Sequence, residues 1–172
     1  RGIGRKCVAF SARTAAEGGR GAVIVVPDHR DVVRVEAALT RSLGPGRHTR
    51  LTADQGPQAR YTAYLKALRG HAQVVVGTRA AAFAPVRDLG LVAWWDDGDD
   101  LLDEPRAPYP HVREVLLARA ADEGAAVLAA AYSRSVAVAE LVSRGVLTPV
   151  EAPRAVVRAA VASVRVAGEG HD

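Results

Sequence analysis

Several carboxylates follow directly after an apolar segment in the middle of the chain. Residues 91–95 read Leu-Val-Ala-Trp-Trp, and they are followed at once by Asp96, Asp97, Asp99 and Asp100. At the end of a buried strand, one carboxylate could hold Mg²⁺ through water while a neighbour activates a water for attack on a phosphate. The alternative is a solvated acidic loop in which aspartate and glycine end the strand by turn formation. Spacing alone favours the solvated loop.

A nucleotide hydrolase of this kind also needs a glycine-rich loop that cradles the phosphates and ends in Lys-Ser or Lys-Thr. Gly2, Gly4 and Lys6 do not have the Gly-x-x-x-x-Gly-Lys spacing, and Cys7 follows the lysine where a hydroxyl is needed. Without that loop the acidic segment has no phosphate to act on. We therefore expect no competent catalytic residue and no metal ligand in this chain.

A second candidate site consists of Gly77, Thr78 and Arg79, which follow a predicted strand. Glycine lets a backbone approach a ligand closely, and threonine and arginine can bond a phosphodiester, so we expect these residues to contact DNA. The alternative is an ordinary turn with a surface arginine. Aromatic side chains that could stack on bases, or instead pack in the core, are Trp94, Trp95 and Tyr109.

An alternation of strands and helices is predicted to position these residues. Apolar runs predict strands at residues 22–26, 49–51, 73–76, 89–95 and 125–130, and helical spacing predicts helices after Asp28 and at 57–68, 110–121 and 135–143. Such alternation is typical of an α/β domain with a mostly parallel sheet and helices on both faces. Its ligands bind beyond the carboxyl ends of the strands, where both candidate sites are expected.

Composition favours a polyanionic partner and argues against a membrane protein. The net charge is +4 and the pI about 9.7, almost wholly from arginine, which pairs with phosphate; a GC-rich coding sequence explains the same bias equally well. No apolar run approaches the roughly 20 residues that span a bilayer, so we expect a cytoplasmic protein. With Cys7 as the only cysteine, no disulfide framework is possible. The absence of methionine suggests a piece of a longer protein.

Three segments taken in order carry a family resemblance. Val25-Val26-Pro27-Asp28, the block from Val75 through Gly77-Thr78-Arg79 to Pro85, and Asp88-Leu89-Gly90-Leu91-Val92 resemble the first motor lobe of the primosomal protein N′ (PriA) family. The resemblance implies a RecA-like, P-loop NTPase-type, three-layer domain. We expect this lobe at residues 22–145, before a linker at 146–172 toward a second lobe. Residues 1–21 are expected to form an irregular or weakly ordered arm, or a poorly packed helix.

The motor motifs of that family are degenerate in this chain. The family's Asp-Glu-Glu-His box falls on Trp95, Asp96, Asp97 and Gly98, and its Gly-Ser-Ala-Thr-Pro segment falls on residues 129–133 and keeps only the central alanine. The resemblance therefore implies the helicase-deficient type found in high-GC actinobacteria. ATP and Mg²⁺ serve active members and Zn²⁺ binds only their second lobe, so no cofactor is expected here.

The resemblance also implies a function in DNA replication. We expect a replication-restart protein that resembles an ATP-dependent 3′ to 5′ DNA helicase, lacks unwinding activity, and meets forked or single-stranded DNA and other primosome proteins through its parent protein. Two alternatives stay open. One is an active ATP-dependent helicase whose phosphate loop lies outside this sequence, and the other is a non-catalytic scaffold that binds no nucleic acid.

Overall fold

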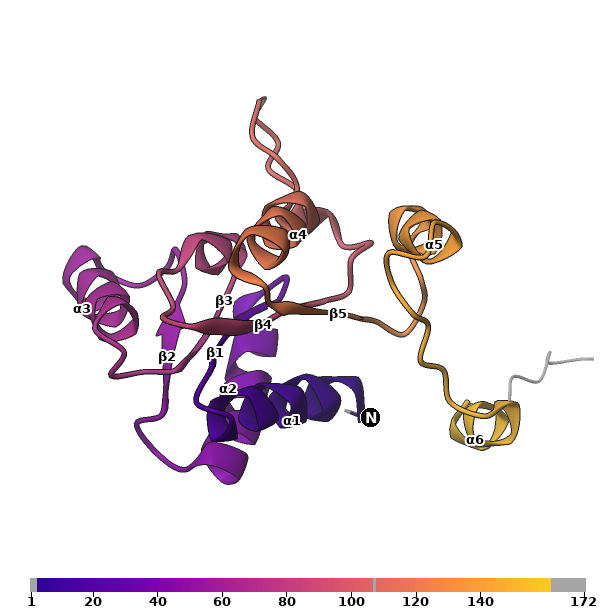
Figure 1. The fold of residues 1–172 in the computed structure, drawn as a ribbon, viewed down its shortest axis with the longest axis horizontal. Coiled ribbons are helices and arrows are strands. Elements are labelled where there is room, and N and C mark those ends of the chain that lie inside the picture. Colours follow the sequence, from indigo (N-terminus) through magenta and orange to yellow (C-terminus); the bar gives the residue numbers. More distant parts are fainter. Residues whose placement is uncertain (1–2, 107, 162–172) are drawn as a thin grey trace, which may run out of the picture.

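Five strands form a single sheet in which every hydrogen-bonded pair is parallel (Figure 1). The computed structural model describes residues 3–106 and 108–161. The strand order is β2-β3-β1-β4-β5, which puts β1 in the centre. The strands are β1 (Gly21–Val25), β2 (His48–Leu51), β3 (Val74–Gly77), β4 (Leu89–Trp95) and β5 (Ala126–Ala130).

Helices cover both faces of this sheet. Helices α1 (Ile3–Glu17) and α2 (His29–Leu43) share a core with one face of the strands. On the opposite face, α3 (Pro57–Leu68), the 3-10 helix η1 (Arg79–Phe83) and α4 (Val112–Glu123) share a second core. The remaining elements are η2 (Asp100–Leu102), α5 (Val136–Ser143) and α6 (Arg154–Ala160). The predicted three-layer α/β domain is confirmed.

The central strands and the following helix form for the reasons visible in the sequence. Every residue of β1 is buried, as expected for an apolar strand covered on both faces. Asp28 caps α2, because its side chain accepts a hydrogen bond from the Asp31 N–H at 2.8 Å. Gly44 ends this helix at φ 86°, a backbone conformation that glycine adopts at little cost.

Of the two expectations for the segment before the first strand, the structure shows a helix and not an irregular arm, and this helix is well packed. Residues 3–17 form α1, and Val8, Ala9, Ala12 and Ala16 are at most 5% exposed against the sheet. The contact surface consists largely of alanine, whose small side chain brings the helix close to the strands without a strong apolar stripe. Periodicity in the sequence is therefore weak, although the packing is tight.

Beyond α5 the chain makes few contacts with the sheet. Helix α6 exposes its apolar side chains, with Val156 and Val157 at 53% and 47% exposure. Within the segment expected to be a linker, α6 spans Arg154–Ala160, and residues 162–172 lie outside the described part of the chain. No helix within the described ranges combines the length and apolar character that crossing a membrane requires.

Candidate functional site at the carboxyl edge of the sheet

The carboxyl ends of three neighbouring strands bring the predicted site residues to one edge. Strands β3, β1 and β4 lie side by side and run parallel, so Thr78, Pro27 and Asp96 follow them at the same edge. Hydrogen bonds between neighbouring strands continue to this edge: the Val26 N–H donates to the Gly77 carbonyl at 2.9 Å, and the Asp96 N–H donates to the Ala130 carbonyl at 2.8 Å. The sequence prediction that both candidate sites share this edge is confirmed.

Asp97 is the most enclosed carboxylate of the acidic segment, at 6% exposure. Its Oδ1 accepts from Trp94 Nε1 at 2.8 Å. Its Oδ2 accepts from a guanidinium nitrogen of Arg113 at 2.6 Å and from the Ser135 hydroxyl at 2.5 Å. Asp97 thus joins the end of β4 to the first turn of α4 and to the start of α5.

Arg113 and Ser135 are residues whose site contacts the sequence does not reveal. They lie 16 and 38 positions from Asp97, and no local spacing connects them to it. By its position before a predicted helix, Ser135 is recognisable only as a cap, and it does cap α5, because its oxygen accepts from the Val138 N–H at 3.1 Å. The same hydroxyl donates to Asp97, so one side chain serves both the cap and the carboxylate.

The other positions of the degenerate box serve the fold. Trp95 is 2% exposed within the core that α1 and α2 cover, and its ring meets Tyr132 edge to face at 5.1 Å between centroids. Asp96 is half-buried at φ 62°, and its carbonyl accepts from the Asp99 N–H at 2.9 Å. Gly98 is exposed, and a Cβ there would approach only Ser135, at 4.0 Å. The segment is a tight turn at the end of β4.

Base stacking by the tryptophan pair is ruled out by burial. Trp94 is 0% exposed and points into the core on the α4 side, whereas Trp95 points into the opposite core. Successive residues of a strand face opposite sides, so the pair anchors β4 in both layers at once. Of the three aromatic candidates, only Tyr109 is exposed, at 64%.

Gly77 has a steric reason to be glycine. A Cβ at this position would lie 1.8 Å from the Leu51 carbonyl oxygen and 2.9 Å from the Ala81 Cβ. Gly77 pairs with Leu51 in the ladder between β3 and β2, so the glycine allows close approach of these two strands. Thr78 follows, half-buried, and Arg79 begins η1.

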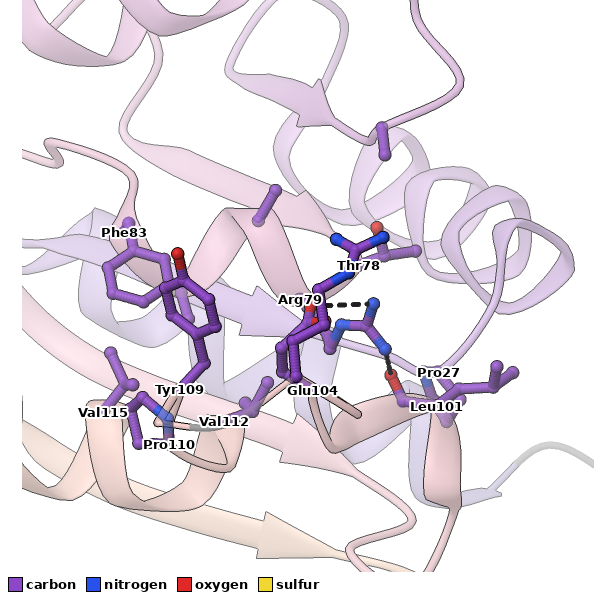
Figure 2. A pocket seen from close by; sticks show the side chains of 14 residues that line it. Pro27, Thr78, Arg79, Phe83, Leu101, Glu104, Tyr109, Pro110, Val112 and Val115 are labelled. Carbon is purple, nitrogen blue, oxygen red and sulfur yellow. Dashed lines mark hydrogen bonds and ion pairs between the residues drawn. The ribbon is translucent and has the colours of Figure 1, made fainter.

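Arg79 holds the acidic loop in place. One guanidinium nitrogen donates to the carbonyls of Leu101 at 3.1 Å and Asp103 at 2.7 Å. The other lies 3.3 Å from Glu104 Oε2, and Figure 2 shows Arg79 with Leu101 and Glu104. The Arg79 side chain is 37% exposed. A phosphate that binds Arg79 must therefore compete with Glu104 for one face of the guanidinium.

A cavity of about 530 Å³ lies beside this clamp. Arg79 and Glu104 line one part of it, and Phe83 and Tyr109 line another (Figure 2). Phe83 is 66% exposed. It belongs to the family block that ends at Pro85, but an aromatic residue after three alanines is not distinguishable from a core residue, so its exposure is not predicted. Two exposed rings and a cation therefore share one concave surface.

His111 is the residue with a shifted pKa that lies nearest the Asp97 cluster. Its Nδ1 accepts from the Arg113 N–H at 3.0 Å and so caps α4. Burial lowers the pKa of His111 below its ordinary value of 6.5, and the positive charge of Arg113 lowers it further, while Asp97, Asp103 and Glu114 oppose the shift. The neutral imidazole required by the cap is therefore favoured.

The residues of the acidic segment do not fit a catalytic Mg²⁺. The position of the family's metal-holding aspartate is occupied by the buried Trp95, and both oxygens of Asp97 accept hydrogen bonds from protein donors. Within the described ranges, no group of three or more His, Cys, Asp or Glu side chains could hold a metal ion. We therefore assign no step of nucleotide hydrolysis to this edge of the sheet.

Sequence comparison finds relatives with a common name. A protein named probable replication restart protein PriA from Mycobacterium leprae (strain TN) is 46% identical over 151 residues, which is 88% of this chain and 23% of that protein. The protein of the same name from Mycobacterium tuberculosis (strain ATCC 25618 / H37Rv) is 45% identical over the same shares. Another from Deinococcus radiodurans is 32% identical over 106 residues, 59% of this chain and 11% of that protein. No family model matches the sequence.

Structural comparison supports the same class of fold. The crystal structure of the DUF1998 helicase MrfA bound to DNA superposes with a TM-score of 0.56 at 10% identity, over 83% of this chain and 19% of that chain. At this identity the likeness concerns the fold alone. The chain spans 23% of the length of its mycobacterial relatives, so it corresponds to one part of those proteins.

The parallel sheet and its two helical layers define a RecA-like α/β domain. The sequence relatives identify the family. The chain is homologous to one segment of the replication restart protein PriA family, and the resemblance found in the motifs is confirmed.

Proposed function

We propose that this chain is a RecA-like lobe of a replication-restart protein, and that it contacts DNA without hydrolysing ATP at its acidic loop. The name shared by its relatives supports the process, and the fold supports the class of protein. Residues 22–145 form the lobe in this proposal, with α1 as an additional packed helix, and residues 146–172 lead toward a second lobe. Other primosome proteins meet it through the parent protein, in the cytoplasm.

The observation that carries the loss of hydrolysis is the set of partners around Asp97. A catalytic carboxylate needs an oxygen that faces a metal ion or a water, whereas Asp97 is 6% exposed and accepts hydrogen bonds from Trp94, Arg113 and Ser135. Trp95 supports the same conclusion, because its ring is buried in the core and cannot hold a metal ion. In this proposal the chain uses no ATP, Mg²⁺ or Zn²⁺.

The proposed DNA contact is made by Thr78 and Arg79, which Gly77 positions. Arg79 is partly exposed at the carboxyl edge, where parallel α/β sheets bind their ligands. The exposed Phe83 and Tyr109 rings line the same cavity as Arg79, a combination of cation and aromatic side chains suited to single-stranded DNA. DNA phosphate must compete with the nearby carboxylate of Glu104 for the Arg79 guanidinium, so this surface is not an open basic patch.

Hydrolysis is tested by measuring phosphate release with ATP, Mg²⁺ and forked DNA on the natural protein that carries this sequence. We expect no release above that of a blank, and the same result for Asp96→Asn. Calorimetry with ATP and Mg²⁺ adds a test of binding. Release that Asp96→Asn abolishes would establish the alternative of an active helicase and overturn the proposal.

The DNA contact is tested by Arg79→Gln in the same protein. We expect weaker binding to forked DNA and a salt dependence reduced by about one unit of slope, as for the loss of one phosphate contact. Arg144→Gln is the matched control, because Arg144 is 67% exposed on the surface just after α5. An unchanged affinity and slope for Arg79→Gln would remove Arg79 from the site.

A further inference from the structure

Two segments of the chain differ sharply in charge. Residues 88–104, which comprise β4 and the acidic loop, contain carboxylates and no Lys or Arg. Residues 41–87 have the opposite composition, with Asp54 as the single acid. Their cations are Arg41, Arg47, Arg50, Arg60, Lys66, Arg69, Arg79 and Arg87. Figure 1 shows that β2 and α3 of this basic segment lie at one end of the sheet, away from β5 and α5.

A groove of about 480 Å³ opens in the basic part of the molecule, between α2, β2 and α3. We name it the β2–α3 groove. It contains two cations, one carboxylate and several neutral hydrogen-bonding side chains. Its lining residues are Glu36, Thr49, Arg50, Gln55, Gln58, Ala59, Thr62, Ala63 and Lys66.

Both cations of the groove have donors to spare. Lys66 is exposed and makes no ion pair with any carboxylate of the described chain. Arg50 lies 3.7 Å from Glu36 and also interacts electrostatically with the exposed Asp54, but neither carboxylate makes a close ion pair with it. Its side chain is 39% exposed, so guanidinium donors remain accessible. Gln55 accepts from the Thr52 N–H at 2.9 Å through Oε1, and its NH₂ group remains as a donor. The groove is thus a set of donors with a net positive charge.

Further cations surround this groove. Arg60 and Arg69 are exposed, on α3 and at its end, and neither forms an ion pair within the described ranges. Helix α3 rests on the sheet through Ala63 and Ala67, so its long side chains project outward. Cations therefore outnumber carboxylates on this surface, and such a surface attracts a polyanion and releases its counterions on binding.

We propose that the β2–α3 groove binds the sugar–phosphate backbone of DNA through Arg50 and Lys66. The partner rests on the proposed function, whereas the surface is separate from Thr78 and Arg79. The groove offers cations and amide donors and no exposed aromatic ring among its lining residues, so the contact reads phosphate and not base sequence. The groove cations are more accessible to phosphate than Arg79, whose guanidinium is paired with Glu104.

The test is a double variant, Arg50→Gln with Lys66→Gln, in the natural protein. Binding of labelled forked DNA is measured by fluorescence anisotropy from about 50 to 300 mM salt. We expect the slope of log K against log salt to fall by about two and the affinity near 0.1 M salt to fall by about tenfold or more, equally for different sequences. Arg144→Gln should leave both unchanged, and Arg50→Lys with Lys66→Arg should keep the slope.

The outcomes separate this proposal from the proposed function. A double variant with wild-type unfolding, affinity and slope overturns the groove, and if Arg79→Gln still weakens binding, the proposed function stands. If neither variant changes binding, both DNA contacts fail. A double variant that loses binding to an acidic polypeptide such as polyglutamate while DNA binding persists assigns the groove to an acidic protein, which also overturns the proposal.

Discussion

At the residue scale, the aspartate of the degenerate box has become a structural connection. Asp97 bonds Trp94 of β4, Arg113 of α4 and the Ser135 that caps α5. In a solvated acidic loop, a carboxylate exchanges its partners with water at little cost. At 6% exposure, the loss of charge on Asp97 instead leaves Arg113 without its closest counter-ion.

Asp97→Asn should therefore destabilise the protein although it leaves the size of the side chain nearly unchanged. We expect a loss of about 2–3 kcal/mol, because the hydrogen bonds to a charged acceptor weaken and Arg113 keeps only Glu114, at 3.1 Å, as its ion-pair partner among the described residues. Urea unfolding followed by fluorescence measures the change. Asp100→Asn, at a position of the same loop, is the control, and equal stability of the two variants would contradict the structural assignment of Asp97.

Glu104 offers a second prediction at this scale. Its carboxylate lies 3.3 Å from Arg79, so Glu104→Gln should free one face of the guanidinium for phosphate. We expect DNA affinity to rise by about two- to fivefold, the range of a partly exposed ion pair. Anisotropy with forked DNA measures it. In an Arg79→Gln background the gain should vanish, and a gain that persists there would show only a general charge effect.

At the scale of elements, a steric requirement at Gly77 and a helix cap at His111 fix the positions of β2, β3 and α4. Gly77 brings β2 and β3 together, and His111 begins α4 with a neutral imidazole that accepts from the Arg113 N–H. A protonated imidazole has no acceptor, so protonation removes the cap. Helix α4 contributes Val112, Leu116 and Ala120 to the core, which couples the cap to the stability of the lobe.

The cap makes stability depend on pH. The folded pKa of His111 is depressed below 6.5, chiefly by burial, so the unfolded chain binds the proton first. The contribution of His111 is then fully present above pH 6.5 and is lost as pH falls from 6.5 through the folded pKa. We expect His111→Asn, which keeps a cap acceptor and does not titrate, to lose less unfolding free energy than the wild type between about pH 7.5 and 5.5.

His48 is an internal reference for that measurement. Burial lowers its pKa as well, against the opposing charge of Glu36, so some pH dependence must remain in His111→Asn. A second variant, His48→Asn, should remove a separate part of it. An identical pH dependence in wild type and His111→Asn would show that the cap does not titrate in this range.

At the scale of the whole molecule, β4 connects both helical layers. Trp94 and Trp95, at 0% and 2% exposure, are packed in the two different cores. We expect the two layers to unfold in one cooperative transition. Trp94→Phe leaves Trp95 as the fluorescent reporter of one core, and Trp95→Phe leaves Trp94 as the reporter of the other. In each variant, the urea midpoint measured by tryptophan fluorescence should equal the midpoint measured by circular dichroism. Midpoints that differ between fluorescence and circular dichroism would show that one layer opens separately.

The strands and most helices could be predicted because their signals are local. The predicted bounds of β4 and α3 are those of the structure, since an apolar run or a helical repeat ends at a turn residue in each case. Helix α1 could not, because alanines that pack closely leave little periodicity. The family resemblance placed the degenerate box correctly at the end of β4, yet it did not show what its residues contact.

The sequence by itself determined the order of the elements and the parallel sheet. It also determined the edge of the sheet on which Gly77, Arg79 and Asp97 lie. These features could be predicted because apolar patterns and turn residues involve neighbours in the chain. Only the tertiary structure decided the partners of these side chains. Asp97 accepts hydrogen bonds from Arg113 and Ser135, and Arg79 contacts the loop that ends in Glu104. These partners are distant in sequence, and the sheet must form before they can meet.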